Sequence, residues 1–168
     1  MPDKLILLMH ESWNDLDRAI SGLAPKEATR RHDGGSSIAW TVGHVTNLVD
    51  SWINARLQGL PSHPVISDPM IRTGGGGDAH NWPAILAGMS EVREASKRFL
   101  DSKPEPDLDR TIPYDGAIDY LHPIGLSLRY ALMRVAAHHF VHVGEIVTIR
   151  YLMGHPAEDF KDWGQALV

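Results

Sequence analysis

The sequence predicts an all-α fold, an antiparallel four-helix bundle with long loops. Four segments carry apolar residues at helical spacing, stretches rich in glycine and proline separate them, and little of the chain alternates like a β-strand. Four long helices with little strand are typical of such a bundle. A chain of 168 residues can bury one good core and is short for two. We therefore expect a single domain over residues 1–168.

The first two helices are predicted from apolar repeats and from residues that start or stop helices. We expect the first helix over residues 3–22, where "GLAPKE" ends it. The second helix begins after Ser36 or Ser37, either of which can cap it, and ends at Gly59 and Pro61. The residues that form the two apolar faces are Leu5, Met9, Leu16 and Ile20 in the first helix, and Ile38, Val42, Val45, Val49 and Trp52 in the second.

A long loop and a third helix follow. Residues 60–80 contain three prolines and four consecutive glycines, a composition that predicts irregular structure. Asn81, with Pro83 in the first turn, opens a helix that runs to about Leu100. The third long helix of the bundle is therefore expected directly after this loop.

The last part of the chain contains a second irregular segment and the longest helix. Within residues 103–122, Asp115 and Gly116 lie between "TIPY" and "AIDY", which predicts a small hairpin. The fourth helix is expected over residues 126–153, and Gly154 closes it.

Composition excludes several classes of protein. Lysine and arginine total 16 against 21 aspartate and glutamate, a net charge of −5, so neither nucleic acid nor an anionic membrane is an expected partner. The chain has no cysteine, which excludes disulfides and thiolate metal sites. The apolar run near the N-terminus is too short for a signal peptide or a membrane span, so we expect a cytoplasmic protein. No nucleophile motif or phosphate-binding loop is present.

The stretch "AAHHFVHVGEI", residues 136–146, places three histidines in an otherwise apolar helical run. On a helical wheel, His142 falls on the apolar face with Ile146, and His138 and His139 flank that face. Residues four apart lie about 40° apart around a helix and residues three apart about 60°, so either neighbour could share one metal with His142. The structural alternative is that each ring donates to a backbone carbonyl or a tyrosine.

His44 is the candidate third ligand. It is the only histidine of the second helix and shares a strip with Trp40 and Leu48 at four-residue spacing. Facing side chains in the core of a bundle are a usual place for metal ligands. Three neutral imidazoles would leave coordination positions open for water or substrate, which is the arrangement of a catalytic metal site.

Taken together, these motifs resemble the DinB/YfiT-like superfamily of four-helix metal proteins. The resemblance spans nearly the whole chain and rests on "SIAWTVGHVTNLVDSW" with its central histidine, the long loop, and "HHFVHVGEIVTIRYLMG" in the last helix. It implies that His44, His138 and His142 are the metal ligands, and it selects His138 over His139. It also implies a nickel, zinc or other divalent ion and a protein that is often a homodimer. Val143 and Glu145 depart from the family, where a basic residue and a glutamine are frequent.

The activities known in that family include thiol S-transferases that use bacillithiol or mycothiol, and mycothiol-dependent maleylpyruvate isomerases. We therefore expect a metal-dependent enzyme, a thiol S-transferase acting on a small electrophile with a low-molecular-weight thiol as partner. One alternative is a non-catalytic binding or stress-response module in which the metal only holds the helices together. The other is a hydrolase that uses metal-bound water. Glu145, three residues after His142, could orient a ligand ring or move a proton, or could be a solvated carboxylate.

Overall fold

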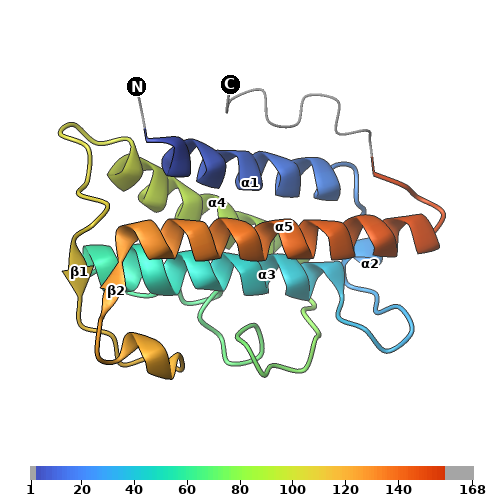
Figure 1. The fold of residues 1–168 in the computed structure, drawn as a ribbon. Helices are drawn as coiled ribbons and strands as arrows, with labels where there is room; N and C mark the ends of the chain where they lie inside the picture. Colours follow the sequence, from blue (N-terminus) through green and yellow to red (C-terminus); the bar gives the residue numbers. More distant parts are fainter. Residues whose placement is uncertain (1–2, 158–168) are drawn as a thin grey trace.

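The structure is a computed structural model that describes residues 3–157, and it confirms the predicted all-α fold (Figure 1). The helices are α1 (Lys4–Ile20), the short α2 (Pro25–Ala28), α3 (Ile38–Val49), its π-helical continuation η1 (Asp50–Leu57), α4 (Trp82–Leu100) and α5 (Leu128–Leu152). Helices α1 and α5 run in one direction, and α3 and α4 run in the opposite direction. The loop between η1 and α4 carries the chain back along the bundle.

The long helices begin and end within two residues of the predicted positions, and a polar side chain caps the start of each one. Each capping side chain accepts a hydrogen bond from a backbone N–H of the first turn, which would otherwise have no partner. The capping residues are Asp3, Ser37, Asn81 and Ser127. Ser37, rather than Ser36, therefore starts the second long helix, and Gly154 follows α5 with a φ of +74°.

The predicted hairpin at Asp115 and Gly116 is wrong. A two-residue strand β1 (Thr111–Ile112) pairs antiparallel with β2 (Leu126–Ser127), and the intervening segment contains the 3-10 helix η2 (Asp119–Leu121). The side chains of Leu121 and Leu126 are buried, so the segment is held to the core at these points. Burial of apolar side chains outweighs the local preference for a tight turn here.

Helix α5 packs against α1 and α3, and its most buried face differs from the predicted one. His139 lies on this face with Val135 and Ile146 and is 1% exposed, whereas His142 is only half-buried. His142, which the sequence places on the apolar face, is therefore less buried than His139, which the sequence places beside that face. Apolar residues occur on nearly every side of α5, so their spacing does not locate the centre of its buried face. In the described residues, 3–157, no helix is long and apolar enough to cross a membrane.

Candidate metal centre

Three histidine side chains meet between α3 and α5. The Nε2 atom of His44 on α3 lies 3.2 Å from Nε2 of His138 on α5, and Nε2 of His142 lies 3.2 Å from the same atom. His138 and His142 are one helical turn apart, so their rings project from the same side of α5 toward α3. The structure thus brings together His44, His138 and His142.

His139 does not join this cluster. Its ring is buried in the core, and Nδ1 donates a hydrogen bond to the backbone carbonyl of Val135, with the two atoms 2.9 Å apart. Burial lowers the pKa of His139 to about 3, so the ring is neutral at physiological pH. The structural alternative considered from the sequence, an imidazole bonded to a backbone carbonyl, describes His139.

The spacing of the three nitrogens fits a divalent ion. Nitrogen ligands bind zinc at about 2.0 to 2.1 Å, which in a tetrahedral site places two of them about 3.3 Å apart. Both observed separations are 3.2 Å, and one ligand atom from each histidine lies within 4.8 Å of the other two. His138 Nε2 faces both neighbours, and a single N–H cannot point well at two acceptors. A cation that accepts one lone pair from each imidazole satisfies all three nitrogens.

Glu145 holds the ring of His142. Its Oε2 atom lies 2.6 Å from His142 Nδ1, so Nδ1 donates to the carboxylate and the lone pair of the neutral ring is left on Nε2. This arrangement directs the lone pair toward the other two histidines. Histidines that bind metals commonly donate their second ring N–H to a carboxylate. Glu145 thus takes the orienting role, one of the two roles considered from the sequence.

Burial favours the neutral, metal-binding form of two of the three histidines. Burial, followed by the charges of His142 and His44, lowers the pKa of His138 to about 3. The pKa of His44 is also lowered, mainly by burial and then by His142. Protons therefore compete weakly with a metal at His44 and His138 near neutral pH.

The histidine cluster lies within a stretch of the chain that matches a known protein family. The sequence profile of the DinB superfamily matches residues 8–146, a range that includes all three histidines and Glu145. The chain belongs to the DinB superfamily. No curated protein matches it significantly. The family match and the histidine cluster together support a site that could hold a metal.

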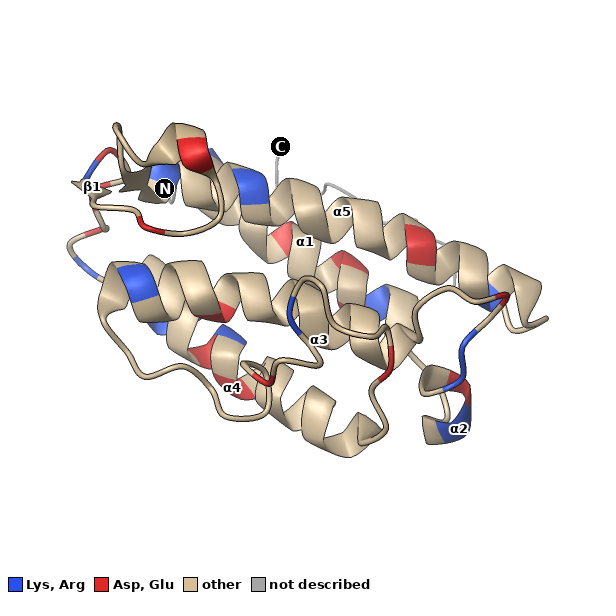
Figure 2. Ribbon diagram, turned by 90° about the horizontal axis from the view of Figure 1, so that it is seen from below, with Lys and Arg blue, Asp and Glu red and all other residues tan. Residues whose placement is uncertain are grey.

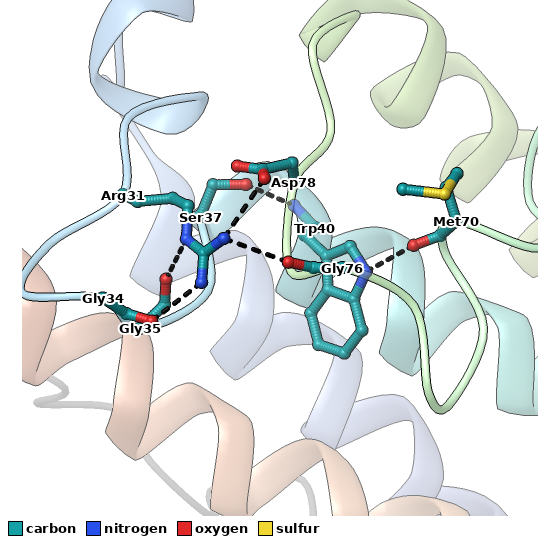
Figure 3. Close-up of polar contacts among 8 residues, drawn as sticks. All are labelled: Arg31, Gly34, Gly35, Ser37, Trp40, Met70, Gly76 and Asp78. Atoms are coloured by element: carbon teal, nitrogen blue, oxygen red, sulfur yellow. Dashed lines mark hydrogen bonds and ion pairs between the residues drawn. The ribbon is translucent and has the colours of Figure 1, made fainter.

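In this DinB-superfamily chain, an aromatic ring also positions one of the histidines. The indole of Trp40 stacks on the imidazole of His44, with ring centroids 4.7 Å apart and an angle of 8° between the planes. Trp40 Nε1 donates a hydrogen bond to the backbone carbonyl of Met70, 2.6 Å away (Figure 3). The four-residue spacing of Trp40 and His44 signals the stacking, but no local pattern signals the bond to Met70.

The glycine-rich loop that follows Met70 is fixed to the start of α3. The guanidinium of Arg31 donates hydrogen bonds to the backbone carbonyls of Gly34 and Gly35 in its own segment. It also donates to the carbonyl of Gly76 in the glycine-rich loop (Figure 3). It also forms an ion pair with Asp78, with N and O 3.2 Å apart. Arg31 therefore ties two irregular segments together beside the helix that carries the first histidine.

Proposed function

We propose that this member of the DinB superfamily is a divalent-metal-dependent enzyme that transfers a low-molecular-weight thiol to a small electrophile. The observation that carries the proposal is the convergence of the Nε2 atoms of His44, His138 and His142. The Nδ1 atom of His142 donates a hydrogen bond to the carboxylate of Glu145. Three protein ligands leave at least one coordination position for a small molecule. A purely structural zinc site would more commonly have four protein ligands.

The side chains of the site fit this chemistry. A divalent ion held by the three imidazoles would lower the pKa of a thiol that binds it, and would so supply a thiolate near neutral pH. His44 and His138 remain neutral there and keep their lone pairs available. Glu145 keeps the His142 ring in the tautomer that presents Nε2. The thiolate sulfur then forms a bond to the electrophilic carbon, the leaving group departs with its electron pair, and the thiol proton passes to solvent.

We also propose that the protein acts as a single-domain homodimer in the cytoplasm. Large apolar side chains are exposed along the outer side of α5, where a second copy would cover them. Met133 is 53% exposed and Val141 is 70% exposed. Sedimentation of the purified chain tests this proposal: a monomer at micromolar concentration would reject it.

Metal content is the first test of the proposed enzyme. The chain is purified without a nickel column, and nickel, zinc, iron and copper are measured by mass spectrometry. We expect about one divalent ion per chain, and less than one tenth of that in His44→Gln. Absence of metal from the wild-type chain, with unchanged stability in chelator, would reject the proposal.

Turnover distinguishes the three candidate functions. Consumption of a halodinitrobenzene is measured with and without a small thiol, in the wild-type chain and in His138→Gln. The S-transferase predicts consumption that needs both the thiol and His138. Turnover of ester substrates without thiol would favour the hydrolase. Stoichiometric metal with no turnover in either assay would favour the non-catalytic module.

A further inference from the structure

A pocket lies along the end of α3, beyond His44, and none of the three clustered histidines lines it, so the metal site does not explain the chemistry of its walls. Its volume is about 390 Å³, and the end of α3, η1, the loop at residues 69–74 and the segment at residues 114–117 form its walls. Polar groups cover more of its surface than apolar groups do. The polar and charged side chains used in the argument below are Asn47, Ser51, Arg56, Arg72 and Thr73.

One wall of the pocket continues the helix that carries His44. Asn47 follows His44 by three residues, which places it about 4.5 Å further along the axis on the same side of α3, and Ser51 lies beyond it near the start of η1. The loop wall is also anchored near His44. Ile71 lies so close to Gly43 that a Cβ at this glycine would lie 2.8 Å from its Cγ2. Arg72, Thr73 and Gly74, which line the pocket, come directly after Ile71.

The pocket is cationic in a chain whose net charge is −5. Two arginines line it, and no aspartate or glutamate does. Arg56 is already engaged, because it forms an ion pair with Asp115, 2.5 Å away, and lies 4.9 Å from the centre of the Tyr114 ring. Within the described part of the chain, Arg72 has neither an ion pair nor a side-chain hydrogen bond. The positive charge of Arg72 would therefore attract an anionic ligand in the pocket.

A third arginine extends the positive charge to the histidines. Arg134 is exposed on α5, one helical turn before His138, and therefore projects from the same side of the helix. A guanidinium binds a carboxylate through two parallel hydrogen bonds, and such pairs are among the strongest polar contacts in proteins. The hydroxyl groups of Ser51 and Thr73 supply further donors at the pocket wall.

From this placement we infer that the pocket binds the carboxylate of the thiol substrate, with Arg72 as its counter-ion. The inference rests on the proposed thiol chemistry, because it places the sulfur at the three histidines and the carboxylate one to two helical turns away. A short aliphatic chain spans that distance. The substrate class is then an acidic thiol rather than a neutral or basic one.

A set of matched thiols tests the inference. Cobalt is loaded into the full chain, and the sulfur-to-cobalt absorption band is titrated with 3-mercaptopropionate, 3-mercaptopropanamide and cysteamine. The first two have similar lengths and differ in charge, and the third is a cation. We expect 3-mercaptopropionate to bind about tenfold more tightly than the amide, and Arg72→Gln to remove that difference while leaving the affinity for the amide unchanged.

The control is Arg30→Gln, which removes the same charge from an exposed arginine that follows α2 and does not line the pocket. It should leave the preference for the carboxylate intact. Equal binding of the three thiols to the wild-type chain would overturn the inference while preserving the proposed function. Equal loss of the preference in Arg30→Gln and Arg72→Gln would also overturn it, because it would indicate a general charge effect.

A second measurement separates failure of the inference from failure of the proposed function. If no thiol produces the absorption band, the proposed thiol chemistry fails. Succinate is therefore also titrated into the chain as purified, and the Arg72 side-chain Nε–H signal is followed by NMR. A saturable shift at Arg72, absent with succinamide, supports carboxylate binding in the pocket whatever the reaction is. No shift at Arg72 would reject it.

Discussion

The indole ring of Trp40 lies parallel to the imidazole ring of His44, with 4.7 Å between the ring centres. The two residues are one turn apart on α3, and the bond from Trp40 Nε1 to the Met70 carbonyl holds the edge of the indole. The loop therefore reaches one of the three clustered histidines through a single aromatic ring. Changes to this ring should alter metal affinity without removing a ligand.

Replacement of Trp40 by leucine should weaken metal binding by about tenfold, because side chains that contact a metal-binding histidine fix the orientation of its ring. Trp40→Phe keeps a stacking face and loses the bond to Met70, so it should fall between leucine and wild type. Affinity is measured by competition with a fluorescent chelator. Trp82→Phe is the control, since Trp82 is equally buried at the start of α4. Wild-type affinity in Trp40→Leu would show that the stacking does not position His44.

Loss of the Glu145 carboxylate should also reduce metal affinity. Glu145→Ala removes the acceptor for His142 Nδ1, and we expect a loss of about 10- to 100-fold. Glu145→Gln keeps an acceptor oxygen and should lose less. Isothermal titration with zinc measures both variants, and Glu94→Gln, on the exposed side of α4, is the control. A Glu145→Ala variant that binds zinc as tightly as Glu94→Gln contradicts the orienting role.

Removal of the metal should lower the melting temperature. A ligand present at 100 times its dissociation constant stabilises the native state by about 2.7 kcal/mol. For a chain of this size that corresponds to about 5 to 10 °C. Calorimetry with and without EDTA measures the shift, and His44→Gln should not respond to EDTA. An equal response in both proteins would mean that the chelator acts elsewhere.

Acid should destabilise the metal-free protein through His139. The pKa of this imidazole is about 3 in the native state because of burial, and about 6.5 in the unfolded chain. As pH falls below 6.5, the unfolded chain binds a proton that the native state does not, so the free energy of unfolding decreases. Between pH 6.5 and pH 5 the loss is on the order of 2 kcal/mol.

Urea unfolding at these two pH values, in chelator, measures the effect. His139→Asn places an amide nitrogen near the position of Nδ1 and cannot titrate. Its free energy of unfolding should therefore change less with pH than that of the wild type. His80→Asn, at an exposed loop position, is the control. The same pH dependence in wild type and His139→Asn would contradict the prediction.

Two helical glycines should respond oppositely to alanine. A Cβ at Gly43 would lie 2.8 Å from Ile71 Cγ2 and 3.3 Å from Ile85 Cδ1, so Gly43→Ala should cost about 1 to 3 kcal/mol and displace the loop. A Cβ at Gly144 meets no atom within 4 Å, so Gly144→Ala should stabilise α5 by up to about 1 kcal/mol. Urea unfolding compares them, and stabilisation by Gly43→Ala would show that the contact with Ile71 is loose.

The positions of the long helices could be predicted from local signals. Ser37 and Asn81 are good caps, and Gly154 ends α5, because these effects depend on neighbouring backbone groups. The β1–β2 pairing could not be predicted in this way. It joins Thr111 to Ser127 across a segment whose path depends on burial of side chains in the core.

Helical spacing is a local property, so the amino-acid sequence was enough to predict that α5 carries histidines one turn apart and that α3 carries another. Which of these histidines meet depends on how the helices pack. The packing of α3 against α5 brings His44 to His138 and His142 and leaves His139 in the core. Helix α5 is apolar on nearly all sides, so periodicity could not mark its central face. The bond from Trp40 to Met70 and the contacts of Arg31 with Gly76 and Asp78 were also decided by the fold, since no local pattern encodes the path of a loop.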